Sequence, residues 1–99
     1  MGAIWTHGTW TVQPGREPEF VRAWEALGDW TVAAFPGAVG TLLRDTERPN
    51  VFISFGPWPD RDTVARWRGS DGFRTHLAAI QDTLESFDPL QLEHVVTKR

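Results

Sequence analysis

The pattern of hydrophobic positions divides the chain into segments with two different periods. Over residues 3–12 apolar and polar positions alternate, and Trp5 and His7 fall on the face opposite Trp10. A period of two is typical of a β-strand. From residue 16 to residue 37, where a Pro-Gly pair ends the segment, apolar residues recur every three or four positions. That spacing predicts an amphipathic helix.

The middle of the chain predicts a hairpin followed by two helical pieces. Residues 39–45 and 51–58 are rich in strand-forming side chains, and a short polar connection joins them. Such a pair favours two antiparallel strands. Residues 59–67 then predict a short helix, which Gly69 interrupts. Ser70 is a suitable N-cap for a second helix, because its hydroxyl can accept a hydrogen bond from a backbone N–H of the first turn.

The second of these helices carries the strongest periodic signal. Its apolar residues step by four, three, four and three positions: Phe73, Leu77, Ile80, Leu84 and Phe87. At 100° per residue they share one face. An Asp-Pro pair ends the helix, and residues 90–97 alternate again, which predicts a fourth strand. The predicted order is therefore β-α-β-β-α-β.

This order predicts an α+β, ferredoxin-like fold, in which a four-stranded antiparallel sheet carries its helices on one face. The other face is then uncovered, although Trp5 lies on it. An uncovered aromatic face favours pairing with a second copy of the same chain about a two-fold axis. We therefore expect a homodimer, with His7 at its interface.

Composition narrows the class of protein. The 99 residues predict one domain, residues 1–99, and include six Trp and six Phe but no Cys. The net charge is −3 and the basic residues are scattered, which argues against nucleic-acid or membrane-surface partners. The absence of Cys excludes thiolate chemistry and suits a reducing compartment. No apolar run reaches the length of a membrane span, so we expect a cytoplasmic protein.

Small and large residues interleave on the strand faces that should point toward the helices. On residues 3–12 these are Ile4, Thr6, Gly8 and Trp10, and on residues 51–58 they are Phe52, Ser54, Gly56 and Trp58. The small members should leave a cavity beneath the second helix, roofed by Phe73 and Leu77. A cavity lined by indoles suits a small, flat aromatic ligand. The alternative is that these Trp side chains simply fill the core.

Few polar side chains could do chemistry there. His76 lies at the border of the apolar helix face, and imidazole suits proton transfer near neutral pH. The alternative is a half-exposed structural histidine. The three His residues are isolated, so we expect no metal site. A group of arginines could clamp a carboxylate or simply form a solvated helix face: Arg61, Arg66, Arg68 and Arg74.

Several short segments resemble a known family. They are the turn at residues 13–15, the Phe-Pro-Gly run at residues 35–37, Trp58, and the run WRGSDGF at residues 67–73. Together they resemble the antibiotic biosynthesis monooxygenase-like proteins of the dimeric α/β-barrel superfamily. The resemblance covers nearly the whole chain. It implies a homodimer whose two sheets form a barrel, with one ligand pocket in each subunit.

The resemblance also implies a reaction. Members include cofactor-independent monooxygenases that act with O2 on phenol, quinol or anthrone-like substrates. In such a reaction His76 could act as the general base, and the indole N–H groups of Trp58 or Trp67 could stabilise the developing oxyanion or peroxide. The quinone-forming members carry Asn four residues before the strand Trp, whereas this chain has Ser54. That departure puts the quinone-forming reaction in question.

Two other functions remain open at this point. The haem-degrading members share Trp67, but their axial His lies one residue beyond His76, and their strand Asn falls at Gly8. One residue turns a helical side chain by about 100°. Haem is thus an alternative to a cofactor-free site. The third possibility is a non-catalytic, dimeric protein that binds a small molecule.

Overall fold

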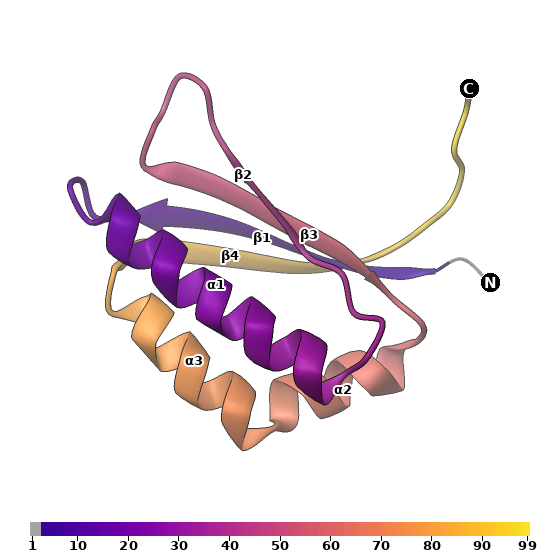
Figure 1. Cartoon of the computed structure of the whole chain (residues 1–99). Coiled ribbons are helices and arrows are strands. Elements are labelled where there is room, and N and C mark those ends of the chain that lie inside the picture. Colours follow the sequence, from indigo (N-terminus) through magenta and orange to yellow (C-terminus); the bar gives the residue numbers. More distant parts are fainter. Residues whose placement is uncertain (1–2) are drawn as a thin grey trace.

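The computed structural model describes residues 3–99 and shows an antiparallel sheet with helices on one face (Figure 1). The elements follow the order β1 (Ile4–Val12), α1 (Glu17–Ala34), β2 (Thr41–Arg44), β3 (Val51–Trp58), α2 (Arg61–Gly69), α3 (Asp71–Gln81) and β4 (Leu84–Glu93). The strand order is β2-β3-β1-β4 and all three pairs are antiparallel. The predicted ferredoxin-like fold class is confirmed.

The two central strands, β1 and β3, place their small residues opposite one another. Thr6 pairs with Gly56, and Gly8 pairs with Ser54. Residues directly opposite in an antiparallel pair share a face of the sheet. Further along β1 on this face, Ile4 and Trp10 belong to two separate core clusters. The small residues therefore lie between two packed clusters, where little side-chain volume is available to fill the space.

The break between α2 and α3 lies where the sequence predicts it. The Ser70 hydroxyl accepts a hydrogen bond from the Phe73 N–H at 3.3 Å and donates one to the Trp67 carbonyl at 2.7 Å. Ser70 thus ends one helix and begins the next, as an N-cap residue can. No helix within residues 3–99 combines the length and the hydropathy required to cross a membrane.

The fourth strand begins earlier than predicted, so the prediction of a helix through Phe87 and a strand over residues 90–97 is wrong. β4 starts at Leu84, and its register against β1 shifts between Thr11 and Val12. Such a β-bulge adds one residue to a strand. It lets Leu84 and Phe87 both pack on the core despite their odd separation. Their spacing of three, which imitates a helix, comes from this bulge.

No helix covers the sheet face opposite α1, α2 and α3 (Figure 1). On β1 it carries Trp5 and His7, since these alternate with the residues that face the helices. Their partners on the neighbouring strands share this face: Phe55 and Pro57 on β3, and Leu90 and Leu92 on β4. Leu90 is 52% exposed and Leu92 is 43% exposed. We call these six residues the outer face.

Candidate functional site

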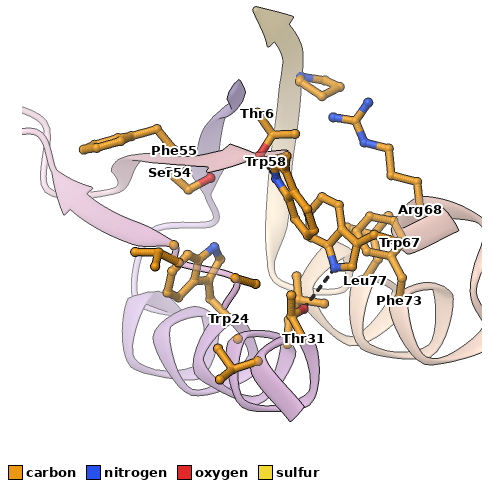
Figure 2. A pocket seen from close by; sticks show the side chains of 18 of the residues that line it. Thr6, Trp24, Thr31, Ser54, Phe55, Trp58, Trp67, Arg68, Phe73 and Leu77 are labelled. Carbon is orange, nitrogen blue, oxygen red and sulfur yellow. Dashed lines mark hydrogen bonds between the residues drawn. The ribbon is translucent and has the colours of Figure 1, made fainter. Parts of the chain in front are cut away.

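A cavity of about 530 Å³ lies between the sheet and the helices (Figure 2). Ligand pockets typically measure about 300–1,000 Å³. Its lining comes from both layers, and includes Thr6, Ser54, Gly56 and Trp58 from the sheet and Trp24, Thr31, Trp67 and Phe73 from the helices. The cavity occupies the gap that the small residues of β1 and β3 leave between the two core clusters.

Gly56 also sets the shape of this cavity. A Cβ atom at this position would collide with the carbonyl oxygen of Val39. The chain between α1 and β2 therefore crosses directly over Gly56, and only glycine permits so close a backbone approach. Val39 and Gly40 in turn line the cavity, and Gly40 lies against the Trp24 ring. The late start of β2, at Thr41 rather than residue 39, follows from this crossing.

Each of three indoles in the cavity donates its N–H to a hydroxyl group. The pairs are Trp10 Nε1 to Ser54 Oγ at 2.8 Å, Trp58 Nε1 to Thr6 Oγ1 at 3.0 Å, and Trp67 Nε1 to Thr31 Oγ1 at 3.0 Å. Figure 2 marks the last of them with a dashed line. All six side chains line the cavity. The buried N–H groups are thus satisfied, as buried donors require.

These pairs determine which polar groups a ligand can meet. An indole nitrogen only donates, whereas a hydroxyl both accepts and donates. Among residues 3–99 none of the three hydroxyls donates to a protein acceptor. Their O–H groups therefore remain available to a ligand oxygen, and hydrogen bonds in series strengthen one another. The Trp58 and Trp67 N–H groups were predicted to contact the ligand directly. Both already donate to hydroxyl oxygens, so the hydroxyls that the indoles orient take this place.

One wall of the cavity is formed by stacked aromatic rings. The Trp58 and Trp67 centroids are 4.7 Å apart at 35°, and Trp67 meets Phe73 edge-on at 4.6 Å. The Ser70 cap places Trp67 and Phe73 side by side, because they flank the turn that it orders. Trp24 faces this wall from α1 (Figure 2). Rings on two sides favour a flat ligand between them.

Comparison with known families agrees with this architecture. The family model described as antibiotic biosynthesis monooxygenase matches residues 4–79. The chain belongs to this family. Among solved structures, a candidate antibiotic biosynthesis monooxygenase from Caulobacter crescentus CB15 is 26% identical, with a TM-score of 0.86. The match covers 96% of this chain and 92% of that one.

Other solved structures share the fold at lower identity. SnoaB from Streptomyces nogalater, described as a cofactor-independent oxygenase, is 24% identical, with a TM-score of 0.85 over 98% of this chain and 97% of that one. A conserved protein from Methanosarcina mazei Go1 is 19% identical, with a TM-score of 0.83 over 94% and 93% of the two chains. No curated protein matches the sequence.

Most residues predicted for the site line the cavity of this monooxygenase-family chain. They are Thr6, Trp10, Ser54, Trp58, Trp67, Phe73 and Leu77. The prediction that Trp58 and Trp67 reach one pocket between the sheet and the helices is confirmed. Their roles in binding and catalysis stay predictions.

Two residues predicted to bind the substrate, Gly8 and Phe52, are not part of the cavity lining. A Cβ at Gly8 would lie 3.1 Å from Ser54 Oγ and 3.1 Å from Trp10 Nε1, so glycine leaves room for their hydrogen bond. Phe52 is 2% exposed and packs on Phe20, with ring centroids 4.8 Å apart. Phe52 therefore belongs to the hydrophobic core of this family member and does not line the cavity, contrary to the prediction.

His76 lies outside the lining of the cavity. Its ring centroid is 6.1 Å from that of Trp30, which packs over Gly72 and fills the space between α1 and α3. A general base must come within hydrogen-bonding reach of the proton that it removes. His76 does not have that position here, nor is it an axial ligand for haem in this cavity. His7 is among the residues that border the cavity, but the alternation along β1 places its side chain on the outer face.

We accordingly expect His76→Ala to keep turnover within about twofold of the wild type, and not to lose the factor of about 10²–10⁴ that a positioned base contributes. Steady-state O2 uptake by the two proteins at equal folded concentration tests this. A loss of about 10² or more, in a variant that keeps its helical circular dichroism signal, would show that His76 is the base after all.

Sequence reasoning missed the contribution of α1 to the lining, in particular Trp24 and Thr31. Trp24 belongs to the apolar stripe of the predicted helix and could simply fill the core, and Thr31 was not singled out. A signal for Thr31 was present, because this polar residue lies four positions after Leu27 on the same face and is 7% exposed. A buried threonine on an apolar stripe needs a polar partner. Here the partner is Trp67.

The predicted arginine group does not act as a unit. Arg74 pairs with Asp71 at 3.0 Å and donates to the Gly69 carbonyl, while Arg66 lies over the Phe35 ring at 5.8 Å. Arg68 alone of the four lines the cavity. Burial lowers the pKa of its guanidinium from the ordinary value.

Proposed function

We propose that this chain is a cofactor-independent monooxygenase that acts with O2 on a small aromatic substrate of phenol, quinol or anthrone type. The observation that carries this proposal is the cavity, which has indole walls and hydroxyl oxygens that accept hydrogen bonds from the indoles. Membership of the monooxygenase family and the fold shared with SnoaB, a cofactor-independent oxygenase, also support it.

In such a reaction the protein need not supply electrons, because the substrate reduces O2 itself. Loss of a proton from an anthrone gives an electron-rich anion, whose carbon reduces O2 and forms a C–O bond. The resulting peroxide takes up a proton, its O–O bond breaks, and the remaining C–H proton leaves with the hydroxide as water. The balance is CH2 + O2 → C=O + H2O. The protein must bind, orient and shield the reacting atoms.

The residues of the cavity divide this work. Trp58 and Trp67 hold the flat substrate by stacking, and the O–H groups of Thr6 and Ser54 donate to its oxyanion. Donors fixed where negative charge develops are often the largest contribution to catalysis. His76 does not line the cavity, and strand alternation directs the His7 side chain to the outer face, so the first proton leaves to solvent from a substrate that is itself acidic.

Ser54 offers the substrate fewer hydrogen-bond donors than the residue found in quinone-forming members of the family. Those members carry Asn at the position of Ser54, and an amide offers two N–H donors. The Ser54 hydroxyl offers one donor and accepts from Trp10. We infer that Ser54 and Thr6 together replace the amide, with one O–H each.

Dithranol, a simple anthrone, provides a test of turnover. Chelator-treated protein should accelerate O2 uptake above the rate of buffer autoxidation and release one quinone-type product for each O2 consumed. Added haem or iron should leave the rate unchanged. A rate equal to that of buffer, with dithranol bound, would instead indicate a non-catalytic binding protein. Dependence on haem would indicate the haem-degrading alternative.

We also propose that the protein is a homodimer whose subunits pair through the outer face. Its apolar side chains would bury surface there, which is the usual reason for an uncovered apolar patch.

Trp5→Asp should convert this dimer to a monomer, because it places a charge at the centre of the apolar face. Light scattering at micromolar concentration should give twice the chain mass for the wild type and the chain mass for the variant. Arg61→Asp, which places the same side chain at an exposed position on α2, is the control and should stay dimeric. A monomeric wild type would contradict the proposal.

A further inference from the structure

Arg68 is the one arginine of α2 and α3 that reaches the cavity. It lies in the last turn of α2, directly after Trp67, and is partly buried. Figure 2 shows its side chain extending from the helix toward the sheet, beside the Trp58 and Trp67 rings. Its guanidinium therefore borders the same space as the aromatic wall.

This guanidinium has no partner within residues 3–99. The ion pairs among the described residues join Arg16 to Glu19 and Asp82, Arg48 to Asp45, and Arg74 to Asp71. No hydrogen bond of Arg68 accompanies them. A partly buried charge that lacks a counter-ion is costly, and its lowered pKa reflects the same loss of solvent. A site of this kind is completed by an anion that arrives with the ligand.

We propose that Arg68 binds a carboxylate carried by the aromatic substrate. Guanidinium and carboxylate form two parallel charge-assisted hydrogen bonds, which fix orientation as well as charge. The carboxylate would lie at the α2 side, the substrate rings against the wall that Trp58 and Trp67 form together, and the reacting oxygen at the Thr6 hydroxyl. This inference rests on the proposed function, because it takes the cavity to be the substrate site, and it narrows the substrate class to aromatic acids.

Two acidic residues of the cavity must be weighed against this. Glu25 and Asp29 of α1 also line it, and both are exposed. Water and salt screen exposed charges, so they repel an anion less than a partly buried cation attracts it. If instead Arg68 only offsets these two carboxylates, the site will show no preference for an acid over a neutral molecule of the same shape.

The test compares 2-naphthoate with 2-naphthamide, which has the same rings but no charge, by titration calorimetry at pH 7. The wild type should bind the acid roughly 10- to 100-fold more tightly, the range expected for charge-assisted hydrogen bonds. Arg68→Met should remove this preference and keep the affinity for the amide, whereas Arg68→Lys should keep part of it. Arg61→Met, at an exposed position of the same helix, should behave as the wild type.

The outcomes separate this inference from the function on which it rests. Equal affinity of the wild type for the two probes overturns the inference and leaves the aromatic site in place. A preference for the acid that survives in Arg68→Met also overturns it. Binding of neither probe overturns both the inference and the proposed function. Circular dichroism of each variant shows whether it is folded.

Discussion

Thr6→Val should lower turnover by about 10²–10³, the usual loss when one donor to a developing oxyanion is removed. Valine keeps the shape of threonine and removes only the hydroxyl, which accepts from Trp58 Nε1 and has its O–H free for the substrate. Because the buried indole N–H loses its acceptor, the free energy of unfolding should also fall by about 1–3 kcal/mol. O2 uptake with dithranol and urea unfolding measure the two effects.

Thr9→Val is the matched control for this variant. Thr9 lies on the same strand but alternates to the other side of the sheet from Gly8 and Trp10. The same chemical change there should leave turnover unaltered. Equal rates for Thr6→Val and the wild type would show that the Thr6 hydroxyl does not contact the reacting oxygen.

Trp58→Ala should have the largest effect on stability, about 3–5 kcal/mol, because it deletes a large buried side chain. Trp58 is 7% exposed and packs with Ile4 and Val64 in the smaller core cluster. It also contacts Phe35 and Trp67, with ring centroids 6.0 Å and 4.7 Å away. A domain of this kind has a total stability of about 5–15 kcal/mol, so the variant should be marginally folded.

Urea unfolding followed by circular dichroism measures this loss. Trp58→Phe is the control, since it keeps a ring in the cluster and removes the hydrogen bond to Thr6. It should lose much less stability than Trp58→Ala. An unchanged unfolding midpoint for Trp58→Ala would mean that the smaller cluster does not depend on this indole.

The fold could be predicted from the sequence where local chemistry and packing agree. Residues 51–58 carry strand-forming side chains and form β3 with those bounds. Ser70 separates two helices because its hydroxyl has both a donor and an acceptor to satisfy. β4 could not be predicted in this way. The bulge gives Leu84 and Phe87 a helical spacing, and only pairing with β1 makes them a strand.

The sequence was sufficient to predict which face of the sheet carries the site, but not how the helices place their side chains around it. Alternation along β1 and β3 placed Thr6, Ser54 and Trp58 toward the helices, and this is where the cavity lies. The position of His76 depended on how far α3 rotates against α1, which sequence spacing does not determine. Trp30 packs over Gly72 and fixes that rotation, and His76 lies against Trp30 rather than in the cavity.

The hydroxyl and indole pairs depended on tertiary contacts. Trp67 and Thr31 are 36 positions apart, and Trp58 and Thr6 are 52 positions apart, so no local pattern joins them. Composition indicated only that many indole N–H groups would need buried acceptors. The structure shows that the cavity hydroxyls supply these acceptors, which leaves O–H groups for a ligand.

The origin of the oxygen in the product tests the central claim most directly. Chelator-treated, haem-free protein is supplied with dithranol under ¹⁸O2, and the product is analysed by mass spectrometry. Our account predicts one labelled oxygen in the new carbonyl, formed faster than in buffer by the wild type and by Thr9→Val, and much more slowly by Thr6→Val. Product formation at the buffer rate by all three proteins would contradict it.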